Sequence, residues 1–420
     1  MNDFPQLTVR TLTESDTDAM LDFIDLVFLE GPTSAEVRAT EVELQDLPAG
    51  RAIGVVDGIA GRDELAGVAT LGGMVMTVPG GTLPLAAVQF VGVSPVYRRR
   101  GVMTTMMRHQ LHTLHETGAE PLAGLTASES VIYGRFGFGI ATFSARFAIP
   151  RGRSALRPVA GIDDVTLRLV PTADSIEACE AVLARYTATR AGALARPAKW
   201  ARGFAADPEQ WREGRSILRT VLAERGGEVV GFARYRTKDE GNPSGLPAGV
   251  AEVAEVYGDD TAALAALVRY LVSIDLVATT KIARQPVDSP IGYLLADFRA
   301  ADPRVRDGLY LRIVDVDRAL AGRTYSVPVS VVLEISDAFC PWNAGRWHLT
   351  GDEKSAQCVR TEAAADLALD VRELAAAYLG GSTLAALAQA ALVTELRPGA
   401  LTDASRAFAT DLAPHLAWGI

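Results

Sequence analysis

The sequence is poor in long apolar runs and in positive charge. No stretch of about 18 or more consecutive apolar residues occurs, so no membrane span is expected. The N-terminus, MNDFPQLTVR, lacks the basic start and apolar core of a secretory signal, and the few scattered cysteines predict a cytoplasmic protein. The formal charge is −10, from 51 acidic and 41 basic side chains. This argues against nucleic-acid binding, which needs clustered cations, and favours cationic partners instead.

Cysteine and histidine are scarce as well. The three cysteines are far apart and odd in number, which predicts buried or reduced thiols and neither a disulfide framework nor a zinc site: Cys179, Cys340 and Cys358. The five histidines form no metal motif, so no metal is expected. Three of them share a helical spacing that predicts one solvated helix face: His109, His112 and His115.

The length of the chain predicts several domains. A chain of 420 residues exceeds what one compact core supports, and 49% hydrophobic with 22% charged residues is a globular composition. Strand and helix signals divide it into residues 1–150, 151–300 and 301–420. In the first part, 7–13 alternates as a strand and 16–28 follows as a helix. A strand ending near Pro95, a helix over 101–117 and a strand from Pro121 predict two parallel neighbours.

The second part repeats this outline. Residues 165–171 repeat the opening strand, 173–189 repeat the first helix, and a hairpin is expected about Gly226-Gly227. The strand–loop–helix pattern returns at 249–271. There the first copy's Tyr-Arg-Arg-Arg-Gly becomes Tyr-Gly-Asp-Asp, whose aspartates cap a helix but repel a phosphate. The first copy can therefore hold an anion, and the second is not expected to.

The last part has a different pattern. Residues 329–337 and 345–352 predict strands or short helices, and 366–392 is rich in Ala and Leu at helical spacing. The end, SRAFATDLAPHLAWGI, is apolar and aromatic where a free tail would be polar. We therefore expect a buried C-terminus.

The loop SPVYRRRGVM between strand and helix is a candidate anion site. A helix N-terminus offers unpaired N–H groups and partial positive charge, Gly101 permits close approach, and the arginines add bidentate donors. These features suit a pyrophosphate, and the alternative is a basic surface turn. The spacing is neither that of a Walker loop nor that of a dinucleotide-binding fingerprint.

The same residues carry a family resemblance. Arg98-x-x-Gly101 after a strand resembles the acetyl-CoA loop of GNAT acetyltransferases, Gln/Arg-x-x-Gly-x-Gly/Ala, with Met103 as a departure at the last position. Together with ASESVIYGRFGFGIAT (127–142), it resembles the Eis (enhanced intracellular survival) family of actinobacteria. The resemblance implies an α/β (α+β) fold. The implied protein has a catalytic GNAT-like domain (1–150), a degenerate GNAT-like domain without the loop (151–300) and a sterol-carrier-protein-like α+β domain (301–420). The two GNAT-like domains are expected to have mixed central sheets.

The resemblance also implies roles for single residues in acetyl transfer from acetyl-CoA to a primary amine. Backbone N–H groups of Val91, Gly92 and Val93 would polarise the thioester. Ser128 and Glu129 would line the pantetheine arm. The pyrophosphate would bind the loop and first helical turn: Arg98, Arg99, Arg100, Gly101, Val102, Met103 and Thr104. Tyr133 would be the general acid and the C-terminal carboxylate of Ile420 the general base. Read from the residues alone, Tyr133 could be a packed aromatic and the tail could merely close the third domain.

The acceptor and the assembly are less constrained. The family implies aminoglycosides, polyamines or lysine side chains, and a homohexamer. Acidic residues near the first helix are candidate acceptor contacts, with a solvated helix face as the alternative: Asp22, Asp25 and Glu30. A longer-chain acyltransferase is an alternative within the same class. A lipid- or hydrophobe-binding protein, with the third domain as its functional part, is the alternative from another class.

Overall fold

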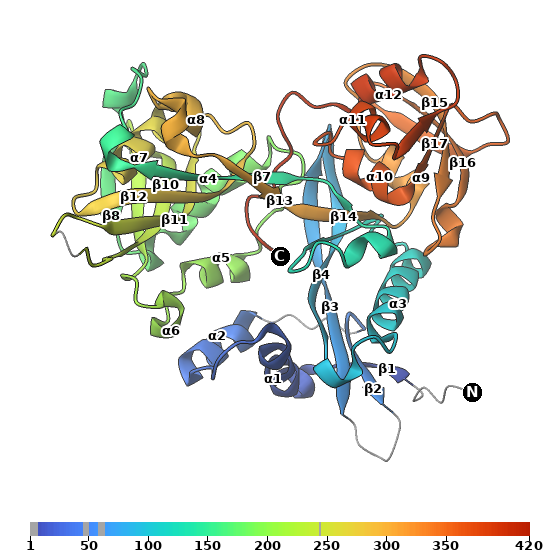
Figure 1. The fold of residues 1–420 in the computed structure, drawn as a ribbon, viewed down its shortest axis with the longest axis horizontal. Coiled ribbons are helices and arrows are strands. Elements are labelled where there is room, and N and C mark those ends of the chain that lie inside the picture. The colour runs from blue at the N-terminus through green and yellow to red at the C-terminus, as the bar shows by residue number, and fades with distance from the viewer. Residues whose placement is uncertain (1–6, 45–49, 58–63, 243–244) are drawn as a thin grey trace. The chain divides into compact units, whose positions relative to one another are not determined.

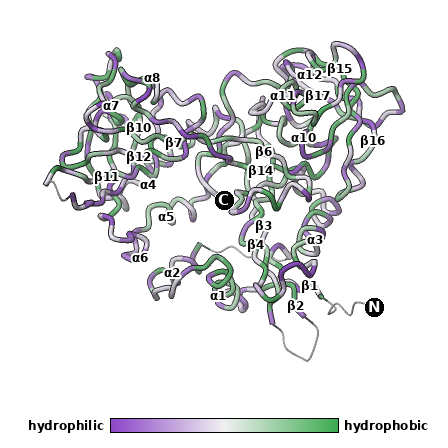
Figure 2. Tube along the Cα trace, in the orientation of Figure 1, coloured by the Kyte–Doolittle hydropathy of each residue, from purple (hydrophilic) through white to green (hydrophobic). Residues whose placement is uncertain are grey.

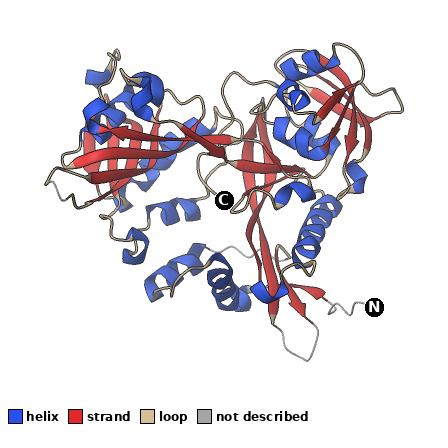
Figure 3. Ribbon diagram, viewed as in Figure 1, coloured by secondary structure: helices blue, strands red, loops and turns tan. Residues whose placement is uncertain are grey.

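The computed structural model describes residues 7–44, 50–57, 64–242 and 245–420, and it contains three sheets with flanking helices (Figures 1 and 3). Packing divides the chain into two compact units. Unit 1 comprises residues 1–142, 308–411 and 419–420, and unit 2 comprises 143–307 and 412–418.

The first sheet belongs to unit 1 and has seven strands in the order β1-β2-β3-β4-β5-β14-β6. Their bounds are Leu7–Thr11 (β1), Ala52–Asp57 (β2), Leu65–Val78 (β3), Gly81–Val93 (β4), Leu122–Thr126 (β5), Gly139–Ile140 (β6) and Leu309–Ile313 (β14). β4 and β5 pair in parallel, which confirms the prediction from the strand–helix–strand pattern, and the other neighbours are antiparallel. The apolar residues of these strands form the core, and Figure 2 shows hydrophobic residues along β3 and β4.

Three α-helices accompany this sheet: α1 (Thr17–Phe28), α2 (Ala35–Leu44) and α3 (Val102–Thr117). The first and third were predicted from their periodicity to within one residue at either end. α3 packs on β3 and β4 through an apolar stripe at helical spacing, which fixes its direction: Val102, Met106, Met107, Leu111 and Leu114. α1 packs on the same two strands with Met20, Phe23 and Ile24.

The third sheet, also in unit 1, has the order β17-β16-β15-β18-β19. Its strands are Val329–Ser336 (β15), Gly345–Gly351 (β16), Ala356–Arg360 (β17), Leu367–Asp370 (β18) and Val393–Glu395 (β19). Its helices are Val316–Ala321 (α9), Val371–Ala377 (α10), Leu384–Gln389 (α11) and Ala400–Phe408 (α12). The helical prediction for 366–392 is wrong at its start, because β18 gains parallel hydrogen bonds to β15 there. α10 begins only after Asp370, whose side chain accepts a hydrogen bond from the Arg372 N–H.

Unit 2 holds the second sheet, in the order β13-β7-β12-β11-β10-β9-β8. Its strands are Phe143–Pro150 (β7), Thr166–Val170 (β8), Arg219–Arg225 (β9), Glu228–Lys238 (β10), Gly249–Gly258 (β11), Val277–Pro286 (β12) and Arg304–Asp307 (β13). Its helices are Ile176–Thr187 (α4), Ala198–Ala205 (α5), Glu209–Arg212 (α6), Thr261–Ser273 (α7) and Ile291–Leu294 (α8). The β9–β10 hairpin turns at Gly226-Gly227 as predicted, with both glycines at positive φ.

Two strands pair in a different sheet from the one that their position along the sequence suggests. β7 ends the residues 1–150 but pairs with β12 and β13 of the second sheet. β14 follows the second copy but pairs with β5 and β6 of the first sheet. Each seven-stranded sheet is therefore completed by a strand that is distant along the chain.

The C-terminal segment is buried, as its composition predicts. His415 and Trp418 are essentially inaccessible, at 0% and 1% exposure. The three cysteines are buried and free, as expected, and burial raises the pKa of Cys340 to about 11. The predicted solvated histidine face is only partly right. His109 is exposed, but His115 stacks on Trp342 and hydrogen-bonds Asp315 at 2.5 Å.

None of the helices in the described ranges has the length and hydropathy of a membrane span. Within the same ranges, no group of three or more His, Cys, Asp or Glu side chains could hold a metal ion.

Candidate active site

The arginine loop and the start of α3 form the first part of the site. The chain leaves β4 through a short 3-10 turn (Pro95–Tyr97), and Arg99 and Gly101 then take left-handed conformations with φ of 63° and 85°. Gly101 is the N-cap of α3, and a Cβ on it would meet nothing within 4 Å. The open space beside its backbone leaves room for a ligand to approach closely.

Unpaired donors gather at this point. The first bond of α3 runs from the Thr105 N–H to the Gly101 carbonyl at 2.9 Å, so the three preceding helical N–H groups have no helical acceptor: Val102, Met103 and Thr104. The three arginines before them are exposed, and none forms an ion pair with a described residue: Arg98, Arg99 and Arg100. Arg100 lies 5.5 Å from the centre of the Tyr97 ring. The loop therefore presents free cations and free amides together, which suits a diphosphate.

β4, the strand that precedes this loop, shares only a short ladder with β5. Their parallel register runs from Leu85↔Leu122 to Ala87↔Gly124 and then ends. Further along β4, Phe90 and Val91 stand opposite a single residue of β3, a bulge in which Phe90 has a φ of 51°. The edge of β4 beyond Ala87, which includes Val91–Val93, thus has no partner in β5. An extended ligand could pair with that edge.

Tyr133 follows β5, after the exposed Ser128 and Glu129, in a 3-10 turn (Tyr133–Phe136). Its ring packs edge-on to Phe138 at 5.8 Å within the core of the first sheet. The side chain is 9% exposed, and its hydroxyl makes no hydrogen bond to a described residue. Burial, and secondly the negative charge of Glu129, raises the pKa of Tyr133 to about 12. The phenol is therefore a protonated donor at neutral pH, and it has no acceptor among the described residues.

Arg312 of β14 and its partner Asp337, which follows β15, support the Tyr133 turn. The turn ends at Gly137, whose φ is 82° and where a Cβ would lie 2.8 Å from the guanidinium of Arg312. Arg312 is fully buried and donates to Asp337 at 2.6 Å. Asp337 also accepts from the backbone N–H of Phe339 and Cys340. A buried ion pair thus holds the turn that carries the tyrosine.

The last residue of the chain belongs to unit 1. The Thr126 hydroxyl, at the end of β5, donates to the terminal oxygen of Ile420 at 2.7 Å. The sequence predicted Ile420 as a site residue but gave no indication of Thr126. A threonine at the end of a strand is too common a pattern to mark it.

The predicted acceptor contacts are already partnered in part. Arg38 bonds Asp22 at 2.9 Å and Asp25 at 2.8 Å, and Thr33 also donates to Asp25. Glu30 is exposed. Asp22 and Asp25 of α1 therefore form a structural cluster with Arg38 of α2, in which the Asp22 side chain is 75% exposed and that of Asp25 is 18% exposed.

Comparison with known proteins now identifies the family. An acetyltransferase (GNAT) domain model matches residues 8–141, another matches 192–313, and a sterol carrier protein domain model matches 316–417. N-acetyltransferase Eis of Mycobacterium tuberculosis is 33% identical over 423 residues, covering 97% of this chain and 98% of that protein. The chain belongs to the Eis family of GNAT N-acetyltransferases.

Further relatives agree. An uncharacterised N-acetyltransferase of Streptomyces coelicolor is 52% identical over 345 residues, which cover 82% of this chain and 83% of that protein. The crystal structure of Eis1 from Mycobacterium abscessus superposes with a TM-score of 0.81 at 32% identity, covering 99% of this chain and 100% of the other. The predicted fold, two GNAT domains with a sterol-carrier-protein-like domain, is confirmed. As an Eis-family enzyme the chain is an N-acetyltransferase, and GNAT acetyltransferases use acetyl-CoA.

Proposed function

We propose that this Eis-family enzyme transfers the acetyl group of acetyl-CoA to a primary amine of a cationic acceptor, in unit 1. The Thr126–Ile420 hydrogen bond carries this proposal. It brings the end of the chain to the end of β5, shortly before Tyr133, so that a carboxylate and a phenol belong to one compact unit with the arginine loop.

The diphosphate of acetyl-CoA would bind the loop from Arg98 to Thr104. The free N–H groups of the first turn of α3 and the helix dipole favour an anion, and the exposed arginines add charge-assisted hydrogen bonds. Val102 and Met103 contribute backbone donors only, so Met103 can replace the small residue of the GNAT pattern there. Its side chain is occupied elsewhere, 3.6 Å from the Arg135 guanidinium.

The pantetheine would extend along the unpaired edge of β4, with Ser128 and Glu129 beside it. Its thioester carbonyl would accept hydrogen bonds from the backbone of Val91–Val93. When the amine lone pair attacks the carbonyl carbon, a C–N bond forms and negative charge moves to the oxygen. One backbone donor to such an oxyanion is worth about 3 kcal/mol of barrier.

The C–S bond then breaks, and the departing thiolate takes a proton from the Tyr133 hydroxyl. Burial makes this transfer harder, because it raises the pKa of the phenol to about 12 and leaves it a weaker acid than a thiol near 8.5. Positioning must therefore replace acid strength, and the rigid Arg312–Asp337 support below the turn supplies it.

The general base would be the carboxylate that Ile420 carries as the last residue of this chain. An α-carboxylate ionises near 3.5 and is a weak base, so a relaying water can take the ammonium proton first. The Thr126 hydroxyl holds one carboxylate oxygen and leaves the other available. Extending the chain beyond Ile420 would displace the carboxylate without removing any tail contact, and turnover should fall.

The acceptors proposed are those that the family implies: aminoglycosides, polyamines and lysine side chains. The net charge of −10 favours approach of a cation, and the exposed carboxylate of Asp22 offers one contact near α1. We further propose a cytoplasmic homohexamer whose domains run over 1–150, 151–300 and 301–420. Sedimentation analysis would test the assembly.

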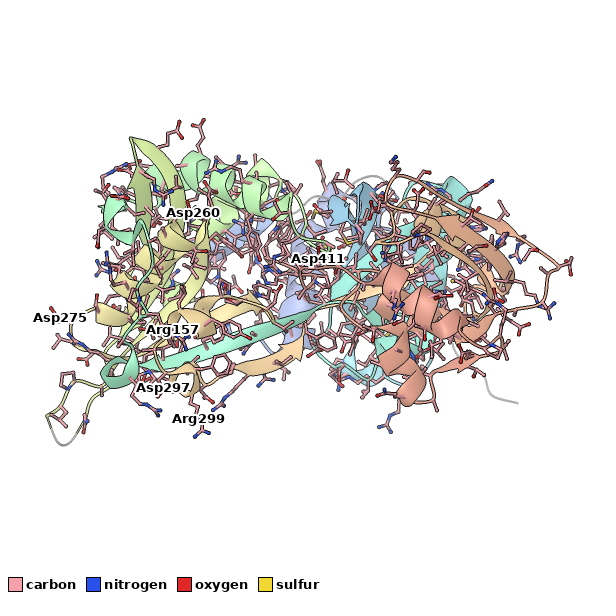
Figure 4. All side chains as sticks on the ribbon, turned by 90° about the horizontal axis from the view of Figure 1, so that it is seen from above. Arg157, Asp260, Asp275, Asp297, Arg299 and Asp411 are labelled. Atoms are coloured by element: carbon pink, nitrogen blue, oxygen red, sulfur yellow. The ribbon has the colours of Figure 1, made fainter. Side chains whose placement is uncertain are left out.

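Calorimetry with acetyl-CoA tests the proposal. Arg99→Glu and Gly101→Glu should each weaken binding about tenfold or more, because they place negative charge where the diphosphate would lie. Arg299→Glu, the same charge reversal at an exposed arginine of unit 2 (Figure 4), should leave binding unchanged. Failure of the unmodified enzyme to bind acetyl-CoA would refute the proposal and favour a hydrophobe-binding role.

A panel of amines assayed by release of free thiol would then identify the acceptor class. Palmitoyl-CoA in the same assay distinguishes the longer-chain acyltransferase, which would turn it over as fast as acetyl-CoA.

A further inference from the structure

The second GNAT copy has the same strand–helix–strand frame as the first but a different occupant. β11 and β12 pair in parallel across α7, and their ladder ends at Val253↔Ile282, as that of β4 and β5 ends at Ala87↔Gly124. Beyond these pairs the two strands run on to Gly258 and Pro286. In the first copy, the equivalent unpaired edge is where we place the pantetheine.

In the second copy the chain's own C-terminal segment, 412–418, contacts both strands beyond the ladder. The Tyr257 hydroxyl of β11 donates to the Ala417 carbonyl at 2.8 Å. The His415 ring, through Nε2, donates to the Arg284 carbonyl of β12 at 3.0 Å. All these residues belong to unit 2.

Helix α4 and the loop after it complete the contacts. The Tyr186 hydroxyl forms a hydrogen bond with the ring nitrogen Nδ1 of His415 at 2.8 Å. The backbone N–H of His415 donates to the Ala191 carbonyl at 2.8 Å. Arg190 donates to the Ala413 carbonyl at 2.9 Å, while Asp288 accepts from the N–H of the same residue. Polar groups of the second copy thus form hydrogen bonds with both the backbone of the C-terminal segment and the side chain of His415.

Trp418 is the apolar anchor of the segment. It is 1% exposed, and its Nε1 donates to the Leu194 carbonyl at 3.0 Å. Trp200 and Phe204 of α5 pack against its ring at centroid distances of 5.5 and 5.9 Å, and Arg196 lies 5.6 Å from it. An aromatic side chain enclosed by other rings, with its polar atom satisfied, is the usual form of an energetic hot spot.

The helix start of this copy carries two aspartates where the first copy has its arginine loop. Asp260, labelled in Figure 4, caps α7 by accepting from the Ala263 N–H at 2.9 Å, and Asp259 pairs with Arg185 at 2.7 Å. A cavity of about 450 Å³ remains there, lined in part by both aspartates, Tyr186 and Leu412. Two carboxylates at the helix start would repel a phosphate, as the sequence predicts.

We propose that the degenerate GNAT copy is a peptide-binding site for the enzyme's own C-terminal segment, held where a functional copy would hold pantetheine. Its task, which rests on the proposed function, is to position the Ile420 carboxylate. Only Gly419 separates Trp418 from Ile420, and two residues span at most about 7 Å. Anchoring Trp418 therefore limits where the carboxylate can lie. Tyr186, Arg190 and Tyr257 are positioning residues on this view.

A cut chain tests the docking without requiring the tail-free protein to fold first. A protease site inserted between Thr410 and the exposed Asp411 would release residues 411–420 as a fragment. We expect the fragment to stay with the cut enzyme through gel filtration, whether or not it carries Asp411→Asn. With Trp418→Ala it should leave at least tenfold faster. Loss of the unmodified fragment from a still-folded chain, or equal retention of the Trp418→Ala fragment, would overturn the proposal.

Add-back of synthetic peptides separates docking from catalysis. After removal of a Trp418→Ala fragment, a labelled 411–420 peptide with a free carboxylate should bind, measured by anisotropy, and restore acetyl transfer. The same peptide with a C-terminal amide should bind equally but restore little. If both peptides restore activity, docking stands and the carboxylate base is wrong. If neither binds, docking is wrong whatever the mechanism of transfer.

Discussion

At the scale of single residues, the Tyr133 hydroxyl offers the most direct test of the mechanism. It has no hydrogen-bond partner among the described residues, so removing it costs no internal contact. Tyr133→Phe should lower kcat by roughly 10²–10⁴-fold, the usual contribution of general acid catalysis. The dissociation constant for acetyl-CoA, measured by calorimetry, should stay within about twofold. An unchanged kcat would return Tyr133 to the role of a packed aromatic.

The pH profile gives a second test at the same residue. The acid must be protonated, and a raised pKa moves its loss of function to higher pH. Because burial raises the pKa of Tyr133 to about 12, kcat should show no alkaline decline from this group up to about pH 10. The measurement is kcat against pH at saturating acetyl-CoA and amine. A decline with an apparent pKa near 8 or 9 would assign the acid to another group.

The motif identified Tyr133 from sequence, but not the direction of its pKa shift. The ring is buried by Phe138 and by core residues from other strands, and no local pattern gives that burial. Thr126 escaped prediction for the same reason, since its partner Ile420 is at the other end of the chain.

At the scale of elements, the Arg312–Asp337 pair ties β14 to the loop after β15. Removing one partner of a buried pair leaves an uncompensated charge, which costs about 3–5 kcal/mol. Asp337→Asn should therefore lower the free energy of unfolding of unit 1 by roughly 3 kcal/mol in urea titrations. Glu334→Gln, at a half-exposed pair with Arg346, should cost less than about 1 kcal/mol.

The double variant Arg312→Met/Asp337→Asn sharpens this test, because asparagine keeps a side-chain oxygen that can accept from the Phe339 and Cys340 N–H groups. It removes both charges, so its stability should recover toward that of the native enzyme. If the pair also positions Tyr133, kcat should stay low in the double variant while stability and acetyl-CoA affinity are restored. Recovery of all three together would limit the pair to a structural role.

Elements were predicted where the signal is local. The apolar spacing of α1, α3 and α7, and the Gly-Gly turn of the β9–β10 hairpin, lie within short windows of sequence. The partners of β7 and β14 were not predictable, because alternation gives a strand its two faces and says nothing of its neighbour. β18 was missed for the same reason, since its pairing with β15 outweighs the helical composition around it.

At the scale of the whole molecule, the two GNAT copies differ in the charge of the loop before the helix and in what lies between the two parallel strands. The first copy keeps a cationic loop before its helix, and the second has Asp259 and Asp260 there. This difference was visible in the sequence. The position of the C-terminal segment in the second copy was not predictable. The apolar sequence LAWGI indicates that the segment is buried, but it does not indicate against which part of the protein.

Occupancy of the second copy makes the stability of unit 2 sensitive to acid. His415 donates through Nε2 to a carbonyl and accepts at Nδ1 from Tyr186, which describes a neutral ring, and burial lowers its pKa to about 4. A depressed histidine pKa destabilises the fold once the unfolded chain, with a pKa near 6.5, begins to bind a proton. The contribution of His415 to the free energy of unfolding is therefore fully present above about pH 6.5. It is lost as the pH falls toward 4, by up to about 3 kcal/mol.

His415→Gln, which cannot be protonated in this range, isolates the effect. The native enzyme should lose more stability between pH 7 and pH 4.5 than this variant does, measured as the midpoint of thermal unfolding by circular dichroism. His109→Gln, at an exposed histidine of α3, should follow the native curve. In the enzyme cut before Asp411, release of the tail fragment should accelerate over the same interval, because the cost of protonation falls on the docked state alone. Equal acid sensitivity of native enzyme and His415→Gln would show that another buried group governs it.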